Sequence, residues 1–306
     1  MKPRHIIDSE QFTLPMLKGI FDLADRMELV VARGGTRDYE GKIMASLFYQ
    51  PSTRTRFSFE AAMLRLGGRT ISTERAEEFS SVVMGETLED TIRVVGNYAD
   101  VIVLRHNEIG GARRAAEVSA VPVVNAGDGK GGQHPTQALL DLYTIYKELH
   151  AVEGVKVAMV GNLADGRTVR SLAYLLGKYE RVKLYFVAPP ELQIKKDVQE
   201  FLTRQNVWFT IENDLRRVLP EIDVVYSTRI ERELLQKSGG PEGDAPWFYI
   251  DRSALSRLPA KALIMHPLPR ANEIAPDVDG DPRAAYFRQT RYGVFVRMAL
   301  LASILD

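Results

Sequence analysis

The segment PSTRTR, residues 51–56, places hydroxyl and guanidinium side chains next to one another directly after a proline. It follows the apolar run 42–49 and precedes a helical pattern, so a strand is predicted to turn into a helix here. A helix N-terminus binds anions readily, and Arg can hold two phosphate oxygens at once. Ser and Thr also cap helices routinely, and Arg is often a solvated surface residue. The local chemistry leaves both a phosphate site and an ordinary helix cap open. The chain has no GxxxxGK[ST] loop, and GNLADG is not GxGxxG, so a nucleotide loop is not indicated.

Polar clusters recur wherever a predicted strand ends. They are PSTRTR after 42–49, Arg105 and His106 ending 99–106, Asp128 to Gln137 after 121–128, Asn162 to Arg167 after 155–162, Ser227 to Arg229 ending 222–229, and His266 to Arg270 ending 262–269. In open α/β sheets, ligands bind beyond the carboxyl ends of the strands. The repetition therefore predicts a site assembled at these strand ends.

Strands and helices must alternate to position these clusters. Further strands are predicted at 182–189 and 207–211, and helices at 134–150, 167–179 and 292–305. Two such series predict an α/β protein with two doubly wound domains, parallel sheets, and an active site in the cleft between the domains. The first domain is predicted to comprise 1–133 plus 289–306, and the second 134–288.

Composition narrows the class of protein. The 306 residues carry 40 Lys and Arg against 40 Asp and Glu, so the net charge is zero. This balance disfavours nucleic-acid and membrane-surface partners, which usually attract a basic excess. The chain has no cysteine, which excludes disulfides and thiolate chemistry and fits a reducing compartment. The five His show no metal-ligand spacing, so neither a metal nor a cofactor is expected. The polar N-terminus and the lack of a long apolar run favour a cytoplasmic protein.

Several segments together carry a family resemblance. In order, PSTRTRFSFE, VLRH, NAGDGKGGQHPTQALLD, GRTVRSLAYLL, STR and MHPLPR resemble the catalytic chain of the aspartate carbamoyltransferase family in its plant and bacterial form. The likeness extends over nearly the whole chain. It implies transfer of the carbamoyl group of carbamoyl phosphate to the amine of L-aspartate, which gives N-carbamoyl-L-aspartate and phosphate in pyrimidine biosynthesis.

The resemblance also implies roles for individual residues. The first domain would bind carbamoyl phosphate through Ser52, Thr53, Arg54, Thr55, Arg105, His134 and Gln137, joined by the carbonyls of Pro267 and Leu268. Of these, Arg54, Thr55, Arg105 and His134 would be catalytic, because donors around the carbonyl oxygen stabilise its developing negative charge. The second domain would bind the carboxylates of the amino acid through Arg167 and Arg229. His134 taken alone could be a core or capping histidine, and Arg229 a surface cation. Arg56 is interpreted as structural.

Some positions depart from the family pattern. Met84 stands where the family has a lysine, Glu231 replaces a glutamine that contacts the amino acid, Gln50 replaces a glutamate, Asn162 an aspartate and Leu234 an arginine. A carboxylate at 231 would repel the carboxylates of aspartate but would suit a substrate with a second amine. Three hypotheses remain: an aspartate carbamoyltransferase, a paralogue acting on another amino acid or a diamino acid, and a relative with low or no activity kept for binding.

The loop 79–90 bears on assembly. The resemblance implies that this loop, with Ser80 and Met84, is lent to the site of a neighbouring subunit. The expected assembly is therefore a homo-oligomer, a trimer with shared active sites, to which a regulatory chain could be added. The expected partners are carbamoyl phosphate and an amino acid, without nucleic acid or membrane.

Overall fold

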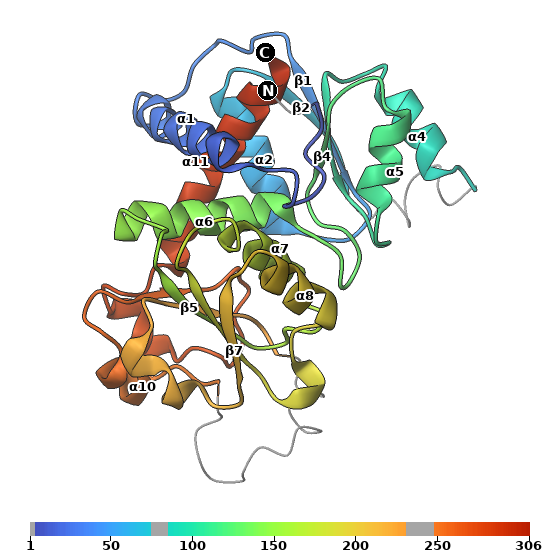
Figure 1. Ribbon diagram of the computed structural model, residues 1–306. Coiled ribbons are helices and arrows are strands. Elements are labelled where there is room, and N and C mark those ends of the chain that lie inside the picture. Colours follow the sequence, from blue (N-terminus) through green and yellow to red (C-terminus); the bar gives the residue numbers. More distant parts are fainter. Residues whose placement is uncertain (1–3, 75–84, 231–247) are drawn as a thin grey trace. The chain divides into compact units, whose positions relative to one another are not determined.

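The computed structural model describes residues 4–74, 85–230 and 248–306. The chain divides into two compact units (Figure 1). Unit 1 comprises Met1–Leu140 and Arg291–Asp306, and unit 2 comprises Asp141–Thr290. The chain passes between units inside helices, because α6 is Pro135–Leu149 and α11 is Tyr286–Leu305. The predicted boundaries, 133/134 and 288/289, lie earlier along the chain than these divisions. The first turns of α6 belong to unit 1, where Leu139 and Leu140 are buried.

The described part of unit 1 forms a parallel sheet in the order β2-β1-β3-β4. Its elements are α1 (Leu14–Ala32), β1 (Ile43–Phe48), α2 (Thr53–Arg65), β2 (Arg69–Glu74), α4 (Leu88–Val95), β3 (Val101–Arg105), α5 (Gly111–Val118) and β4 (Val123–Asn125). Figure 1 shows α4 and α5 on one side of the sheet and α1, α2 and α11 on the other. Right-handed crossovers explain this, since the connection from β1 to β2 runs opposite to those from β2 to β3 and β3 to β4.

Unit 2 contains a second parallel sheet, in the order β7-β6-β5-β8-β9. Its elements are β5 (Lys156–Val160), α7 (Arg167–Leu176), β6 (Lys183–Val187), η2 (Pro190–Leu192), α8 (Lys196–Arg204), β7 (Trp208–Glu212), η3 (Leu215–Arg217), η4 (Leu219–Glu221), β8 (Val224–Ser227), α10 (Arg252–Arg257), β9 (Leu263–Met265) and η5 (Pro276–Gly280). Helix α7 connects β5 to β6 and α8 connects β6 to β7, so both connections move toward the β7 edge of the sheet. Helix α10 connects β8 to β9, so this connection moves toward the other edge. The two groups therefore cover opposite faces of the sheet (Figure 1).

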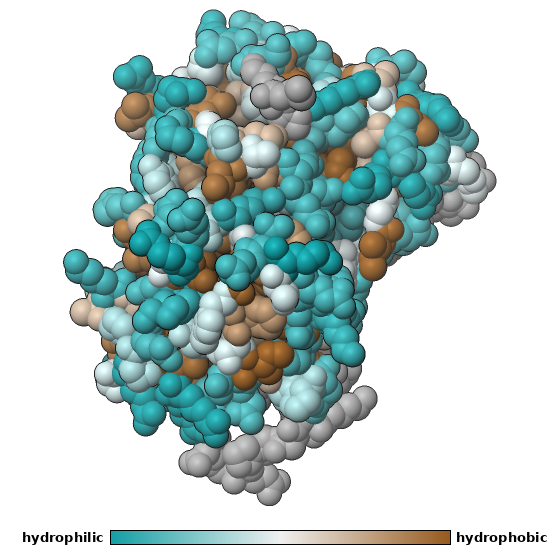
Figure 2. Space-filling model, in the orientation of Figure 1, coloured by the Kyte–Doolittle hydropathy of each residue, from teal (hydrophilic) through white to brown (hydrophobic). Residues whose placement is uncertain are grey.

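The strands at the centre of both sheets are mostly apolar. β1, β5 and β8 are almost wholly buried, as expected for parallel strands covered on both faces. The face of the molecule drawn in Figure 2 is mostly hydrophilic, with scattered apolar residues. Among the described residues no helix is long and apolar enough to cross a membrane.

Candidate active site

Both sheets reverse their direction of winding at one place, and the predicted site residues flank it. In unit 1 this place lies between β1 and β3, whose ends are aligned by the pairing of Phe48 with Arg105. In unit 2 it lies between β5 and β8, where Val160 pairs with Ser227. Because the connections leave in opposite directions there, a crevice opens at the carboxyl edge of such a sheet.

The helix α2 begins at this edge without a side-chain cap from Ser52. Ser52 holds the N-cap position with φ −160° and ψ 78°, yet its side chain makes no capping hydrogen bond, and the first turn contains no acidic residue. The capping role left open by the sequence is therefore not the one adopted. Thr55 is buried, whereas Thr53 and Arg54 are exposed. Within the described ranges Arg54 forms no ion pair, and partial burial lowers the pKa of its guanidinium, which remains a cation.

Arg56 is tied into the scaffold. Its guanidinium forms ion pairs with Glu74 at 3.1 Å and with Glu60 at 3.7 Å. The other oxygen of Glu74 accepts a hydrogen bond from the backbone N–H of Ser52 at 3.2 Å. Glu74 ends the neighbouring strand β2, so it joins that strand to the first turn of α2. This geometry agrees with the structural role predicted for Arg56.

Arg105 and His134 converge on Gly127. A Cβ at residue 127 would lie 2.6 Å from Nη1 of Arg105 and 3.3 Å from Cδ2 of His134, and the φ of Gly127 is +119°. Glycine is required there for both reasons, the close approach and the backbone conformation. Arg105 Nη1 also donates to the carbonyl of Ala126 at 3.1 Å, and the ring of His134 is buried. A cation and an imidazole are thereby fixed side by side at the end of β3.

The polar loop before α6 has an internal structure of its own. The N–H of Asp128 donates to the carbonyl of Gln133, and the carboxylate of Asp128 accepts from the N–H groups of Gly110 and Ala112 at the start of α5. Gln137 lies in the first turn of α6, where its N–H donates to the carbonyl of His134 at 3.1 Å. Unit 1 therefore places the predicted residues of the first domain at one sheet edge.

In unit 2, the ends of β5 and β8 hold the two predicted arginines. Arg167 is the first residue of α7, whose N-cap Gly166 makes no side-chain hydrogen bond and whose first turn has no acidic residue. Gly161, with φ +128°, lets β5 pass within contact of Thr228, since a Cβ there would lie 2.3 Å from the Thr228 hydroxyl. Arg229 is exposed at the next position and forms no ion pair within the described ranges.

The chain beyond β9 is held by two buried side chains. Glu273, 1% exposed, accepts hydrogen bonds from the N–H groups of Ile230 at 3.1 Å and Ala271 at 2.6 Å. His266 Nδ1 accepts from the N–H of Leu268 at 2.8 Å, and Leu268 has a left-handed φ of 57°. The carbonyls of Pro267 and Leu268, which are predicted to accept hydrogen bonds, thus belong to a constrained turn at the same edge as Arg167 and Arg229.

Met84, Glu231 and Leu234, which depart from the family pattern, lie outside the described residues, as does Ser80, which matches that pattern. Gln50 lies half-buried just after β1. The Oδ1 of Asn162 accepts a hydrogen bond from the N–H of Asp165 at 3.3 Å and so shapes the turn that leads to α7.

Some residues important to the site were not predicted. Gly127 and Glu74 contact predicted residues directly, but Gly127 was one of several glycines in a polar run and Glu74 belonged to a segment not recognised as a strand. The glycine-rich run NAGDG after an apolar strand was the available signal for Gly127. No signal distinguished Glu74 from other acidic residues.

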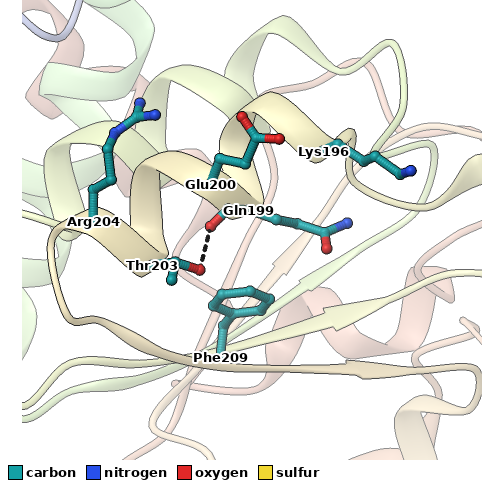
Figure 3. A pocket seen from close by; sticks show the side chains of 6 residues that line it. All are labelled: Lys196, Gln199, Glu200, Thr203, Arg204 and Phe209. Atoms are coloured by element: carbon teal, nitrogen blue, oxygen red, sulfur yellow. Dashed lines mark hydrogen bonds between the residues drawn. The ribbon is translucent and has the colours of Figure 1, made fainter.

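A hollow of about 540 Å³ lies away from these residues, between α8 and the edge strand β7 (Figure 3). It is lined by Lys196, Gln199, Glu200, Thr203, Arg204 and Phe209. None of them is a predicted site residue, and the one hydrogen bond drawn, from the Thr203 hydroxyl to the Gln199 carbonyl, is internal to α8. The chemistry is therefore assigned to the sheet edges. Among the described residues no group of His, Asp or Glu has the arrangement of a metal site.

Comparisons with known proteins agree with this geometry. The profile of the aspartate/ornithine carbamoyltransferase carbamoyl-P binding domain matches residues 4–147, and that of the Asp/Orn binding domain matches residues 153–304. The chain is 52% identical over 307 residues to a chloroplastic aspartate carbamoyltransferase of Oryza sativa, covering 98% of this chain and 84% of the relative. It is 48% identical to the aspartate carbamoyltransferase catalytic subunit of Methanothrix thermoacetophila, covering 100% of this chain and 99% of the relative.

Solved structures are similar over the same length. Aspartate transcarbamoylase from Trypanosoma cruzi in complex with carbamoyl phosphate and aspartate has a TM-score of 0.93 at 40% identity, covering 100% of this chain and 96% of that one. The same enzyme in complex with N-(phosphonacetyl)-L-aspartic acid also has a TM-score of 0.93 at 40% identity.

Proposed function

The chain belongs to the aspartate/ornithine carbamoyltransferase family, and from this premise we propose that it transfers the carbamoyl group of carbamoyl phosphate to L-aspartate. The amine nitrogen of aspartate attacks the carbonyl carbon, an N–C bond forms, and the C–O bond to phosphate breaks. The phosphate leaves with the bonding electron pair and takes the proton that the amine loses. The products are N-carbamoyl-L-aspartate and phosphate.

Unit 1 supplies the groups for the anion and the developing oxyanion. The N-terminus of α2, with Ser52, Thr53, Arg54 and Thr55, binds the phosphate, because uncapped N–H groups and a guanidinium both favour negative charge. Arg105 bridges phosphate and carbonyl oxygen, and His134 with Thr55 donates to that oxygen. These donors are positioned before the reaction begins, which is the condition for stabilising charge in a transition state.

Unit 2 supplies the groups for the acceptor. Arg167 and Arg229 bind its two carboxylates, since guanidinium matches carboxylate geometry. The carbonyls of Pro267 and Leu268, with Gln137 from unit 1, accept hydrogen bonds from the carbamoyl NH2. The departing phosphate is the proton acceptor, because no carboxylate of the described site is predicted for that role.

One observation carries the assignment on the structural side. Arg105 ends β3, the strand paired with β1, and it meets His134 at Gly127. β1 leads into α2, whose N-cap Ser52 makes no side-chain capping hydrogen bond. A cation, an imidazole and a helix N-terminus at one sheet edge suit a leaving phosphate and a developing oxyanion. Transfer of the carbamoyl group directly to the amine requires no nucleophilic side chain of the protein.

The alternative acceptor, another amino acid or a diamino acid, rested on Met84, Glu231, Gln50 and Leu234. The similar proteins named above are aspartate carbamoyltransferases, and the solved structures include complexes with aspartate, so they favour the aspartate assignment. Retention of Arg167 and Arg229 argues in the same direction.

We further propose a cytoplasmic homotrimer with shared sites, to which a regulatory chain can bind. The support is the family pattern of loop 79–90 and the name catalytic subunit carried by archaeal relatives. The absence of cysteine fits a reducing compartment. Sedimentation of the purified protein tests the assembly, and a fully active monomer would contradict it.

A carbamoyl-transfer assay tests the reaction. Purified protein is incubated with carbamoyl phosphate and one of L-aspartate, ornithine, 2,3-diaminopropionate or putrescine, and the carbamoylated product is measured. We expect L-aspartate to be the best acceptor. A preference for a diamino acid would make Glu231 the specificity residue. If no amine gives a carbamoylated product, the remaining hypothesis is a binding protein without transferase activity.

A further inference from the structure

A buried hydrogen-bonded cluster lies beneath the sheet edge of unit 2, and none of its members was predicted to belong to the site. The hydroxyl of Tyr226 donates to Oδ2 of Asp141 at 2.6 Å, and Nε2 of Gln289 donates to Oδ1 at 2.6 Å. Asp141 and Tyr226 are 0% exposed, and Gln289 is 1% exposed. The two oxygens of one buried carboxyl therefore connect α6, β8 and α11.

One branch of this cluster leads to the carbonyl turn. Oε1 of Gln289 accepts a hydrogen bond from the backbone N–H of His266 at 3.1 Å, and Nδ1 of His266 accepts from the N–H of Leu268 at 2.8 Å. Leu268 has a left-handed backbone, which residues with a side chain adopt rarely. The contacts that fix this conformation thus trace back to Asp141.

The other branch leads to the two arginines. Tyr226 lies in β8, just before the strand end that carries Arg229. The pKa of Tyr226 is raised well above its usual value by burial and by the adjacent Asp141, while a hydrogen bond from Thr168 opposes this shift. Thr168 directly follows Arg167 at the start of α7. Arg167 is therefore next to a residue that contacts the cluster, and Arg229 follows Tyr226 by three residues along the chain.

A buried carboxyl by itself contributes little to the free energy of unfolding. Removing it from water costs free energy that its hydrogen bonds only partly return, and an apolar group of similar size often serves as well. Such clusters do, however, specify one geometry, because every donor and acceptor must be satisfied together.

We propose that Asp141 is a positioning residue that acts through Tyr226, Gln289 and His266. It holds Arg167 and Arg229, which bind the acceptor, and the Leu268 carbonyl, which accepts from the carbamoyl NH2, in one mutual arrangement. This inference rests on the proposed function and deepens it. Asp141 touches no substrate; it acts through the residues that do. Unit 1 is not part of the cluster, so its phosphate site is independent of Asp141.

The test compares two buried tyrosines of the same sheet. Tyr226→Phe removes the hydroxyl that meets Asp141. Tyr185→Phe is the matched control, because Tyr185 in β6 is 4% exposed and its hydroxyl meets a carboxylate, Glu221, which with burial raises its pKa to about 12. The measurements are kcat, the KM for aspartate, the inhibition constant of inorganic phosphate, and the thermal midpoint.

We expect Tyr226→Phe to raise the KM for aspartate about tenfold, with the inhibition constant of phosphate unchanged. Tyr185→Phe, which removes a hydrogen bond to the exposed Glu221, should leave the KM for aspartate unchanged. Asp141→Asn, which keeps the volume but cannot accept both hydrogen bonds, should raise the KM for aspartate at least as much as Tyr226→Phe. Equal KM values for aspartate in both tyrosine variants would overturn the inference. It would also be overturned if Tyr226→Phe and Asp141→Asn failed to fold while Tyr185→Phe folded, because the cluster would then serve only stability.

The wild-type protein in the same assay separates this question from the proposed function. An inactive wild type on every amine contradicts the function itself. An active wild type with an unaltered Tyr226→Phe variant contradicts only the inference. If another amine proves to be the acceptor, its KM replaces that of aspartate in the comparison.

Discussion

Arg54 is the residue on which phosphate binding should depend most directly. It extends from the first turn of α2 and has no ion-pair partner within the described ranges. We expect Arg54→Ala to raise the KM for carbamoyl phosphate by about one to two orders of magnitude, because a hydrogen bond to a charged group is worth about 1.5–3 kcal/mol. Steady-state kinetics measure this effect. Arg33→Ala, which removes an exposed cation after α1, should leave the KM unchanged; equal effects would withdraw the phosphate assignment.

Site residues could be predicted from the sequence where they lie at the ends of apolar runs. Arg105 and Arg229 were found because each closes such a run. Gly127 was not, since its importance lies in the 2.6 Å approach of a side chain from another strand. Asp141 was not either, because a lone acidic residue in an apolar helix gives no indication of its partners. Contacts between distant segments are set by packing, which a single sequence does not show.

At the scale of elements, Glu74 links β2 to α2 and should set the direction of the phosphate-binding helix end. We expect Glu74→Gln to raise the KM for carbamoyl phosphate about fivefold, the factor given by ~1 kcal/mol for a partly exposed pair. The physical reason is that Arg56 loses its nearer carboxylate, at 3.1 Å. Kinetics of this variant beside Glu108→Gln, which weakens an exposed pair with Arg114, measure the effect. No difference between them would mean that β2 does not position the helix.

Every described strand except the edge strand β2 overlaps a predicted run, including the other edge strands β4, β7 and β9. The predicted runs 42–49, 99–106 and 155–162 contain β1, β3 and β5, which are almost wholly buried. The edge strand β2, with the sequence RTISTE, was not predicted, because its mostly polar residues give no apolar run. Strand order was also out of reach, since parallel neighbours need not be consecutive in sequence. The two places where the connections change direction, between β1 and β3 and between β5 and β8, follow only from the strand order.

For the whole molecule, acidic side chains should set the lower pH limit of stability. Burial alone would raise the pKa of Asp100, but hydrogen bonds from the Ile43 N–H and the Lys42 ammonium outweigh it and lower the pKa. A lowered folded pKa contributes stability above the unfolded value, about 3.9, that is lost as the pH falls through the folded pKa. Asp197, Asp214, Asp279 and Asp281 are shifted in the same direction.

Asp100→Asn tests this pH dependence. The variant should unfold at a lower temperature than the wild type at pH 7. The two curves should approach each other as the pH falls from about 3.9 through the lowered folded pKa of Asp100, below which Asp100 is protonated in the wild type as well. Thermal unfolding followed across this range gives the answer. A constant gap between the two curves would show that the charge of Asp100 contributes nothing.

The hydrogen bond between Asp141 and Gln289 joins the beginning of unit 2 to its end. On the unit 1 side the two helices also meet, because a Cβ on Gly293 would lie 3.1 Å from Cδ2 of Leu140. The chain thus departs from unit 1 and returns to it at one place, and unit 2 is an insertion whose ends are neighbours. In evolution, such an insertion can be replaced as one continuous segment. A different acceptor specificity can then arise while the sheet of unit 1, which binds phosphate, stays unbroken.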